Sequence, residues 1–275
     1  MKGKKWGWWS AGVTSAVACK IATEMYDNVE LYYIHIDSAH EDNHRFKRDC
    51  EEWYGQEIKP LKSDKFKDQF DVIEKTGYIN GPTGARCTLE LKKQVRFDLE
   101  ELYSFNLFND IVIENQIWGF EFDKNQINRA IRFARQYPNT KPLFPLIEKG
   151  IDKNMCAGML LNAGISLPVM YEMGYSNNNC IGCVKGGAGY WNKIRVDFPE
   201  TFNRMATAER KINHSCIKGK FLDELDPNSG RMSKEVMPSC GIICEVEFAD
   251  IPDKNLNEVF EGSMSIYDAI NKAIF

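Results

Sequence analysis

The residues of this chain best suited to chemistry are its nine cysteines. Cys180 and Cys183 are separated by two residues and followed by glycines, a spacing that lets two thiolates bind one metal ion or one corner of an iron–sulfur cluster. A redox dithiol has the same spacing, but this pair does not open a helix after a first strand as thioredoxin-like motifs do. We therefore favour a metal-binding pair. Its remaining ligands are expected among Cys87, Cys240 and Cys244.

Cys87 has a second interpretation, because it follows Arg86 and precedes a predicted helix that carries Lys92. Neighbouring positive charge favours a thiolate, and Arg86 and Lys92 also suit a phosphate or sulfate group. An inert buried thiol is the alternative for Cys87. Among the other cysteines, the role of Cys216 stays open, and helical patterns indicate core or surface positions for Cys19, Cys50 and Cys156.

A run of small residues near the N-terminus is the second candidate site. An apolar segment at residues 5–9 precedes it, and a helical pattern at residues 14–25 follows it. A strand, a small-residue loop and a helix N-terminus in this order direct backbone N–H groups at one point, which suits a phosphate or pyrophosphate. An ordinary helix cap is the alternative. The predicted phosphate-binding residues are Ser10, Ala11, Gly12, Val13, Thr14 and Ser15.

Two later segments carry further candidates for nucleotide binding. Asp37 and His40 follow the second apolar segment directly and could contact a nucleotide or its metal, whereas Asp42 is interpreted as the cap of the next helix. Arg129 lies on one face of a predicted helix, where it could reach a phosphate or face solvent.

These residues need a scaffold, and the hydrophobic pattern predicts an α/β one. The predicted strands are residues 5–9, 30–36, 57–61 and 110–114, and the predicted helices are residues 14–25, 42–54, 67–74, 89–103, 124–135, 152–163, 190–211 and 265–275. Such alternation predicts a doubly wound parallel sheet of Rossmann-like type. The prolines of residues 141–146 exclude a central strand there. We expect a nucleotide-binding domain over residues 1–170 and a smaller helical, cysteine-bearing region over residues 171–275 packed on it.

Composition and charge narrow the range of protein classes to which this chain can belong. The net charge is −4 with both signs mixed, so no overall basic field indicates nucleic-acid binding. No run approaches the roughly 20 apolar residues of a membrane span, and the N-terminus lacks the pattern of a signal peptide. We expect a cytoplasmic protein without membrane contact, whose cysteines bind metal or react rather than form structural disulfides.

With these residues in hand, the chain resembles the phosphoadenosine phosphosulfate (PAPS) reductase family of the adenine nucleotide α-hydrolase-like (PP-loop, HUP-type) superfamily. The resemblance runs over residues 4–244 and looks like that of a divergent member of the kind met in phages. Residues 10–15 are similar to the PP-loop, residues 84–92 to the cysteine-containing motif, and residues 238–242 to the Glu-Cys-Gly-Ile-His of the reductases. The departures from the family pattern are Ala11 for Gly and Thr14 for Asp in the loop, Thr88 for the second Cys, Ser239 for Glu and Ile243 for His.

The resemblance implies an enzyme that acts on an adenine nucleotide (ATP, PAPS or APS) in sulfur chemistry. In a reductase, the Cys240 thiolate attacks the sulfur of a sulfonucleotide, the loop and Arg86 or Lys92 hold the departing adenylate, and a thioredoxin-like dithiol releases sulfite. The missing Glu and His beside Cys240 favour a ligand role for Cys240 instead.

Two alternatives remain open. One is an ATP-dependent sulfurtransferase that thiolates a nucleobase or nucleic acid and holds a [4Fe–4S] cluster on Cys87, Cys180, Cys183 and either Cys240 or Cys244. The other is a non-catalytic nucleotide-binding module in which the cysteines hold structural zinc.

Overall fold

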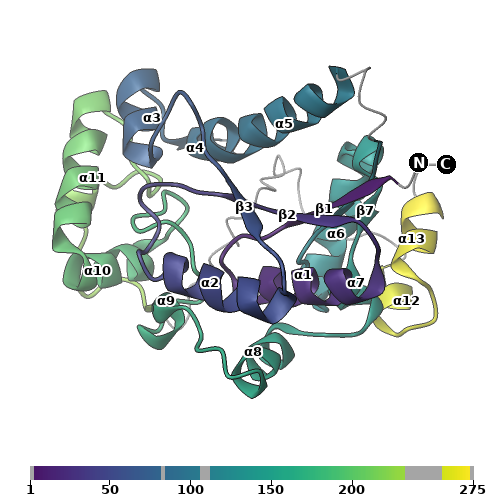
Figure 1. The fold of residues 1–275 in the computed structure, drawn as a ribbon. Helices are drawn as coiled ribbons and strands as arrows, with labels where there is room; N and C mark the ends of the chain where they lie inside the picture. The colour runs from purple at the N-terminus through teal and green to yellow at the C-terminus, as the bar shows by residue number, and fades with distance from the viewer. Residues whose placement is uncertain (1–2, 82–83, 106–111, 233–255, 273–275) are drawn as a thin grey trace.

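A computed structural model describes residues 3–81, 84–105, 112–232 and 256–272. Its centre is a five-stranded parallel sheet with the strand order β3-β2-β1-β6-β7 (Figure 1). The strands are β1 (Lys4–Trp8), β2 (Val29–Ile34), β3 (Ile58–Leu61), β6 (Ile113–Ile117) and β7 (Pro142–Leu143). The predicted fold class, a doubly wound Rossmann-like α/β sheet, is therefore confirmed.

The residues of β1 explain how both faces of the sheet are covered, because successive side chains of a strand point to opposite faces. Trp6 and Trp8 pack into the core of one face, and Trp9, directly after the strand, packs into the other. The first face is covered by α5 (Gln94–Phe105), α6 (Lys124–Gln136), α12 (Leu256–Phe260) and α13 (Ile266–Lys272). The second is covered by α1 (Val13–Met25), α2 (Asn43–Tyr54), α7 (Pro145–Glu148) and α8 (Lys153–Asn162).

A third hydrophobic cluster lies beside the sheet and contains Cys183, the second cysteine of the pair. It combines α3 (Gln69–Thr76) and the hairpin of β4 (Asn80–Gly81) and β5 (Gly84–Ala85) with α9 (Val169–Glu172), α10 (Ala188–Asp197) and α11 (Pro199–Ile212). The cysteine-bearing region is thus built partly from the first half of the chain, and α12 and α13 return to the sheet.

The prediction of one continuous helix over residues 190–211 is wrong, because α10 and α11 are separate helices. Proline has no N–H group and disfavours helical geometry in the residue before it. Phe198 accordingly leaves the helical region, with φ −139° and ψ 64°, and Pro199 begins α11.

Three other elements can be compared with the strands and helices that the sequence predicts. The helical run after β5 begins at α4 (Arg86–Thr88) and passes through a π-helical turn (Leu89–Lys93) before α5, so it starts earlier than expected. The fourth strand occupies residues 113–117 rather than 110–114. The proline-containing β7 forms the edge of the sheet, which confirms that this segment is not a central strand. Within the described ranges, no helix has the length and apolar character to cross a membrane.

Candidate functional site

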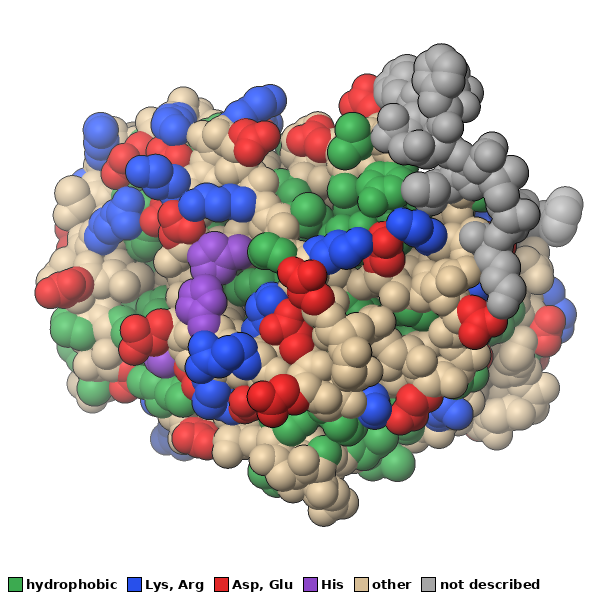
Figure 2. Space-filling model, in the orientation of Figure 1, with side chains coloured by type: hydrophobic (Ala, Val, Ile, Leu, Met, Phe, Trp, Pro, Cys, Tyr) green, Lys and Arg blue, Asp and Glu red, His purple; other side chains and the backbone are tan. Residues whose placement is uncertain are grey.

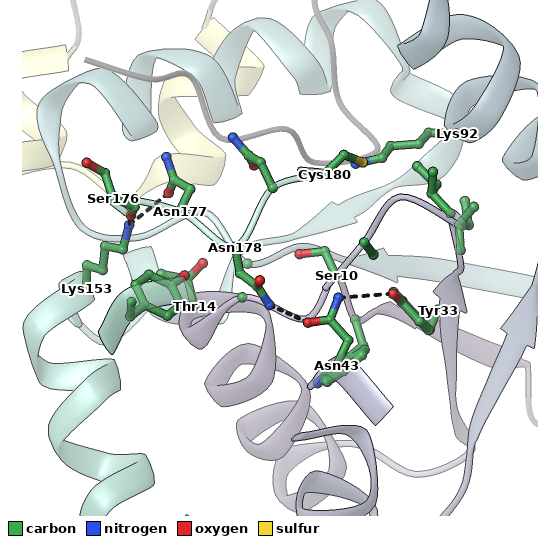
Figure 3. Close-up of a pocket in the computed structure, with 18 of the residues that line it drawn as sticks. Ser10, Thr14, Tyr33, Asn43, Lys92, Lys153, Ser176, Asn177, Asn178 and Cys180 are labelled. Atoms are coloured by element: carbon green, nitrogen blue, oxygen red, sulfur yellow. Dashed lines mark hydrogen bonds between the residues drawn. The ribbon is translucent and has the colours of Figure 1, made fainter. Parts of the chain in front are cut away.

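A cavity of about 320 Å³ lies where β1 and β6 end (Figure 3). These neighbouring strands connect onward to opposite halves of the sheet, β1 toward β2 and β6 toward β7. Such a switch point is where doubly wound sheets bind their ligands. The cavity also receives residues from the start of α2, from the π-helical turn and from residues 176–180.

The small-residue loop forms one wall of this cavity. Ser10, Gly12 and Thr14 line it, whereas the side chains of Ala11, Val13 and Ser15 are buried behind the wall. The Ser15 hydroxyl accepts hydrogen bonds from the Ser10 backbone N–H (3.0 Å) and the Ser10 hydroxyl (3.1 Å), and donates one to the Gly12 carbonyl (2.9 Å). Ala11 adopts a left-handed φ of 60°. The loop is therefore closed by its own hydrogen bonds, with the N-terminus of α1 directed at the cavity.

Two residues that the sequence did not single out fix the position of this helix N-terminus. A β-carbon on Gly119, directly after β6, would lie 2.7 Å from the Ser15 Cα, so only glycine allows α1 to approach so closely. The Tyr171 hydroxyl receives hydrogen bonds from the backbone N–H groups of Val13 and Asn178. Burial raises the pKa of Tyr171 to about 12, so it stays a neutral phenol at physiological pH.

Side-chain amides connect the wall of the cavity to the segment before the cysteine pair. The Asn178 amide donates to the Ala11 carbonyl (2.7 Å) and to the Asn43 side-chain oxygen (2.7 Å), and Asn43 in turn donates to the Tyr33 hydroxyl (3.4 Å). Figure 3 shows the bonds from Asn178 to Asn43 and from Asn43 to Tyr33. It ties β2, α2 and the β1–α1 loop to residues 176–180, so the site is fixed by residues distant in sequence.

Two lysines contact the cavity from opposite ends, as Figure 3 shows. At one end, Lys153 donates to the Ser176 carbonyl and to the Asn177 side chain (2.8 Å), and its ammonium lies over the Tyr171 ring. Burial lowers the pKa of Lys153, and the nearby Glu121 carboxylate opposes that shift. Burial also raises the pKa of Glu121. Lys92 lies at the other end, beside Cys180. The two cations suit a ligand with more than one anionic group.

Besides Ala11, Val13 and Ser15, four further predicted nucleotide-binding residues are not among the described residues that line the cavity. Asp37 pairs with Lys62 (3.1 Å), Arg86 pairs with Glu90 (2.7 Å), the His40 ring accepts a hydrogen bond from the Asp42 backbone, and Arg129 bonds Gln126. The segment that follows β2 contributes instead through Ala39 and through Asn43, the first residue of α2.

Asp42 stands at the predicted cap position of α2, but its carboxylate makes no capping hydrogen bond. It binds Arg45 (2.6 and 2.8 Å) and accepts a hydrogen bond from the Val169 N–H (2.9 Å). Burial acts to raise the pKa of Asp42, but these bonds outweigh it and the pKa lies below its usual value. Asp42 therefore connects α2 to the start of α9.

A second, smaller cavity of about 10 Å³ adjoins the first. Cys87, Cys180 and Cys183 all line it, and Cys180 and Lys92 line both cavities. The structure thus brings together three of the predicted metal ligands. The space is too small for an organic ligand, and besides the three cysteines its polar lining residues are Gln69, Thr88 and Lys92.

The turn that carries the cysteine pair is held in place by two side chains. The Tyr190 hydroxyl accepts hydrogen bonds from the N–H groups of Gly182 (3.0 Å) and Cys183 (2.9 Å). The Gln69 amide donates to the Ile181 carbonyl (2.8 Å). Gly182 has a left-handed φ of 78°, and a β-carbon there would collide with Thr201. The turn is therefore rigid before any ligand binds.

The other cysteines divide into two groups. Cys19, Cys50 and Cys156 are buried in the core beneath the sheet, and burial raises the pKa of Cys50 and of Cys156 to about 12. Cys216 is buried in the cluster that contains Cys183. The candidates Cys240 and Cys244 lie outside the described residues.

Over the described part of the chain, no group of three or more His, Cys, Asp or Glu side chains is arranged to hold a single metal ion. Comparison of the chain with protein-family models, with curated proteins and with solved structures finds no match. The functional conclusion therefore depends on the site itself.

Proposed function

We propose that this protein is an enzyme of sulfur chemistry that binds an adenine nucleotide in the cavity at the end of β1 and β6. The proposal depends on one observation, that the two cavities share part of their wall. Cys180 and Lys92 border both the space beside the phosphate-type loop and the space lined by three cysteines. A nucleotide and sulfur chemistry would then meet within one site.

The loop and the two lysines account for nucleotide binding. Backbone N–H groups in the first turn of α1, other than that of Val13, which bonds the Tyr171 hydroxyl, hold a phosphate group, because they have no partners within the helix and the helix dipole is positive at that end. Lys92 and Lys153, at opposite ends of the cavity, bind further anionic groups. Glu121, with its raised pKa, lines the cavity and can bond a neutral hydroxyl of the ligand.

Reduction of a sulfonucleotide, as in the PAPS reductase family that the sequence resembles, is the favoured reaction. A cysteine thiolate, Cys240 by resemblance, attacks the sulfur atom and forms an S–S bond. The bond between sulfur and the phosphate oxygen breaks, and adenylate leaves with the electron pair. A thioredoxin-like dithiol then attacks the cysteine sulfur, is oxidised to a disulfide, and releases sulfite. Lys92 and the helix N-terminus stabilise the negative charge of the departing adenylate.

An ATP-dependent sulfurtransferase acting on a nucleobase is the second candidate, because Cys180 lies in the cavity wall where an activated group would be held. The surface offers it little support, since basic and acidic side chains are interspersed over the face in Figure 2. Nucleotide preference separates the two candidates.

The test is calorimetric titration of the full chain with PAPS, APS, ATP and ADP, followed by an anaerobic assay of sulfite release with a dithiol reductant. Thr14→Glu places a negative charge on the cavity wall, and we expect it to weaken binding about tenfold or more. Thr207→Glu, on the exposed face of α11, is the matched control. Equal affinity in both variants would rule out the loop as the phosphate site. Tight binding of ATP without sulfite release from PAPS or APS would favour the sulfurtransferase.

A further inference from the structure

We propose that Cys180 is the nucleophile of the proposed sulfonucleotide reduction and that Cys183 is the thiol that releases sulfite from it. This assignment rests on the proposed function. It moves the first step from Cys240, which lies outside the described residues, to a thiol in the wall of the nucleotide cavity. The cysteine pair then acts as a redox dithiol and not as a pair of metal ligands.

The position of Cys180 is the first observation. Of the described cysteines, only Cys180 lines the nucleotide cavity, and it lines the smaller cavity as well. Its side chain is partly exposed. The backbone N–H of the next residue, Ile181, donates to the carbonyl of Ser38 (2.9 Å), in the segment that follows β2. Cys180 is therefore held at the ligand-binding edge of the sheet.

A lysine at the same end of the cavity favours the thiolate that a nucleophile needs. Lys92 lines both cavities together with Cys180, and Figure 3 shows the two side chains next to each other. Burial raises the pKa of Tyr33, and the charges of Cys180 and Lys92 act on it in opposite directions. Both groups therefore lie within electrostatic reach of one hydroxyl. An ammonium group beside a thiol stabilises the thiolate.

The backbone that carries Lys92 is itself unusual. Lys92 belongs to the π-helical turn Leu89–Lys93, and such distortions occur frequently at functional sites. Leu91 of the same turn is buried and lines the smaller cavity, so the turn is anchored beside the cysteines. This anchoring keeps the lysine at the cysteine end of the nucleotide cavity.

Cys183 is placed to react with Cys180, because the two residues begin and end one tight turn. Gly182 has the left-handed φ of 78° that the third position of a type II turn requires. Such a turn holds the Cα atoms of its first and last residues less than about 7 Å apart, and disulfides span about 4.4–6.8 Å between Cα atoms. The Tyr190 hydroxyl bonds both cysteines, donating to the Cys180 carbonyl (3.3 Å) and accepting from the Cys183 N–H (2.9 Å).

The two thiols differ in exposure as the two steps require. Cys183 is 4% exposed and belongs to the third hydrophobic cluster, so a dithiol in solution reaches the partly exposed Cys180 more readily. Both thiols line the smaller cavity, whose volume of about 10 Å³ holds at most about one water molecule. Cys87 lines the same cavity from another segment and is the competing partner for Cys180.

The proposed reaction balances over two steps. The Cys180 thiolate attacks the sulfur of the sulfonucleotide and forms an S–S bond, while the bond from that sulfur to the phosphate oxygen breaks and adenylate leaves with the electron pair. The Cys183 thiol then attacks the Cys180 Sγ, and sulfite leaves with the electron pair of the broken S–S bond and the proton of Cys183. The sulfonate sulfur is reduced and the cysteine pair is oxidised to a disulfide. A thioredoxin-like dithiol restores the pair by exchange at Cys180.

Mass spectrometry after a single turnover locates the sulfonate. Reduced full-length protein is mixed anaerobically with PAPS or APS, without an external dithiol. Wild-type protein should release one equivalent of sulfite and gain a disulfide between Cys180 and Cys183. Cys183→Ser should retain the sulfonate on the peptide that contains Cys180, and Cys180→Ser should neither retain nor release it. Cys156→Ala, which removes a buried thiol that lines neither cavity, should behave as the wild type does.

Alkylation with iodoacetamide, in the absence of nucleotide, tests the role of Lys92. Lys92→Met should move the pH midpoint for alkylation of Cys180 upward by about half a unit or more, because the thiolate loses a neighbouring positive charge. Lys93→Met is the matched control, since Lys93 follows directly in the chain and lines neither cavity. An unshifted midpoint in Lys92→Met would overturn the activation of Cys180 by this lysine.

Circular dichroism establishes that each variant is folded, and Cys180→Ala and Cys183→Ala provide second variants. The proposal is overturned if the sulfonate is found on Cys240 or Cys87, if a Cys180 variant still releases sulfite, or if the disulfide joins Cys180 to a residue other than Cys183. In each of these cases the wild type still reduces the sulfonucleotide, so the proposed function stands. A wild type that releases no sulfite from PAPS or APS would instead refute the proposed reduction, and this assignment with it.

Discussion

Gly119 lies directly against the backbone of Ser15, where a β-carbon would stand 2.7 Å from the Ser15 Cα and 2.8 Å from its nitrogen. Both contacts are with backbone atoms, which cannot turn aside as a side chain can. The absence of a side chain at Gly119 thus lets the start of α1 meet the end of β6, and this contact sets the depth of the cavity between them.

Gly119→Ala is expected to push α1 away from β6 and to lower the free energy of unfolding by about 1–3 kcal/mol, the usual cost of overpacking. Nucleotide affinity should fall with it. Gly158→Ala is the matched control, because Gly158 lies within α8 with nothing within 4 Å of its added methyl, and alanine should stabilise that helix by about 0.5–1 kcal/mol. Urea unfolding of both variants checks the pair. A Gly119→Ala protein as stable as the wild type would contradict the steric role.

Ser15→Ala tests whether the loop is held shut by its own hydrogen bonds. The substitution removes the acceptor of the Ser10 N–H and the donor to the Gly12 carbonyl inside a buried space, so we expect a loss of about 1–2 kcal/mol of stability. Ser10→Ala leaves both of these contacts in place, removes only the bond from the Ser10 hydroxyl to Ser15 at a partly exposed position, and should cost less. Thermal unfolding of the two variants gives the comparison. Equal losses would show that Ser15 has no special part in closing the loop.

Binding of an anion should weaken as the pH rises above neutral, through the lowered pKa of Lys153. Burial disfavours the charged ammonium, so it loses its proton below the ordinary value of 10.5, and the attraction is present below that lowered pKa and lost above it. Among the groups near Lys153, burial raises the pKa of Glu121, and it raises the pKa of Cys156 and of Tyr171 to about 12.

Titration of ADP at increasing pH checks this expectation. Lys153→Met should bind more weakly at neutral pH and should lack the alkaline decline, whereas Lys149→Met, on the exposed surface beside it, should behave as the wild type does. An unchanged decline in Lys153→Met would assign the pH dependence to a group other than Lys153.

Tyr190→Phe removes the oxygen that accepts the N–H groups of Gly182 and Cys183. Two buried donors lose their partner, so we expect a loss of about 2 kcal/mol or more in stability and faster amide hydrogen exchange at residues 182 and 183. Tyr175→Phe, in the same cluster, loses only a bond to Asp197 and leaves the turn intact. Slow exchange at residues 182 and 183 in Tyr190→Phe would mean that Gln69 alone holds the turn.

The sequence predicted most of the sheet because its signals are local. The loop after β1 could be recognised from consecutive residues, as could the helices that follow each strand. Gly119, Tyr171 and Asn178 could not be recognised as partners of that loop, since each comes from a segment more than a hundred residues away. Asp37 and His40 were placed near the cavity by their position after β2, but the chain turns there so that Ala39 and Asn43 line it instead.

The break between α10 and α11 could have been predicted from the sequence, because Pro199 itself, within the predicted helix over residues 190–211, is a local signal for it. The prediction of one helix gave more weight to the helical periodicity on both sides of the proline than to the proline. The approach of Cys87 to the cysteine pair depends on segments distant in sequence, and contacts between such segments, like those of the Asn80 amide with the carbonyls of Val184 and Cys216, are not indicated by any spacing along the chain.

The central position of β1 determines when the site can exist during biosynthesis. Its partner β6 is joined to it by a buried hydrogen bond from Trp8 to Gln116, 108 residues later in the chain. Until β6 has left the ribosome, β1 has a neighbour on one side only and the cavity lacks its second wall. Parallel pairing over such a separation is slow to form. A nucleotide should therefore bind only after most of the chain has been synthesised. Its binding should favour the pairing of β1 with β6 over premature association of the incomplete sheet with other chains.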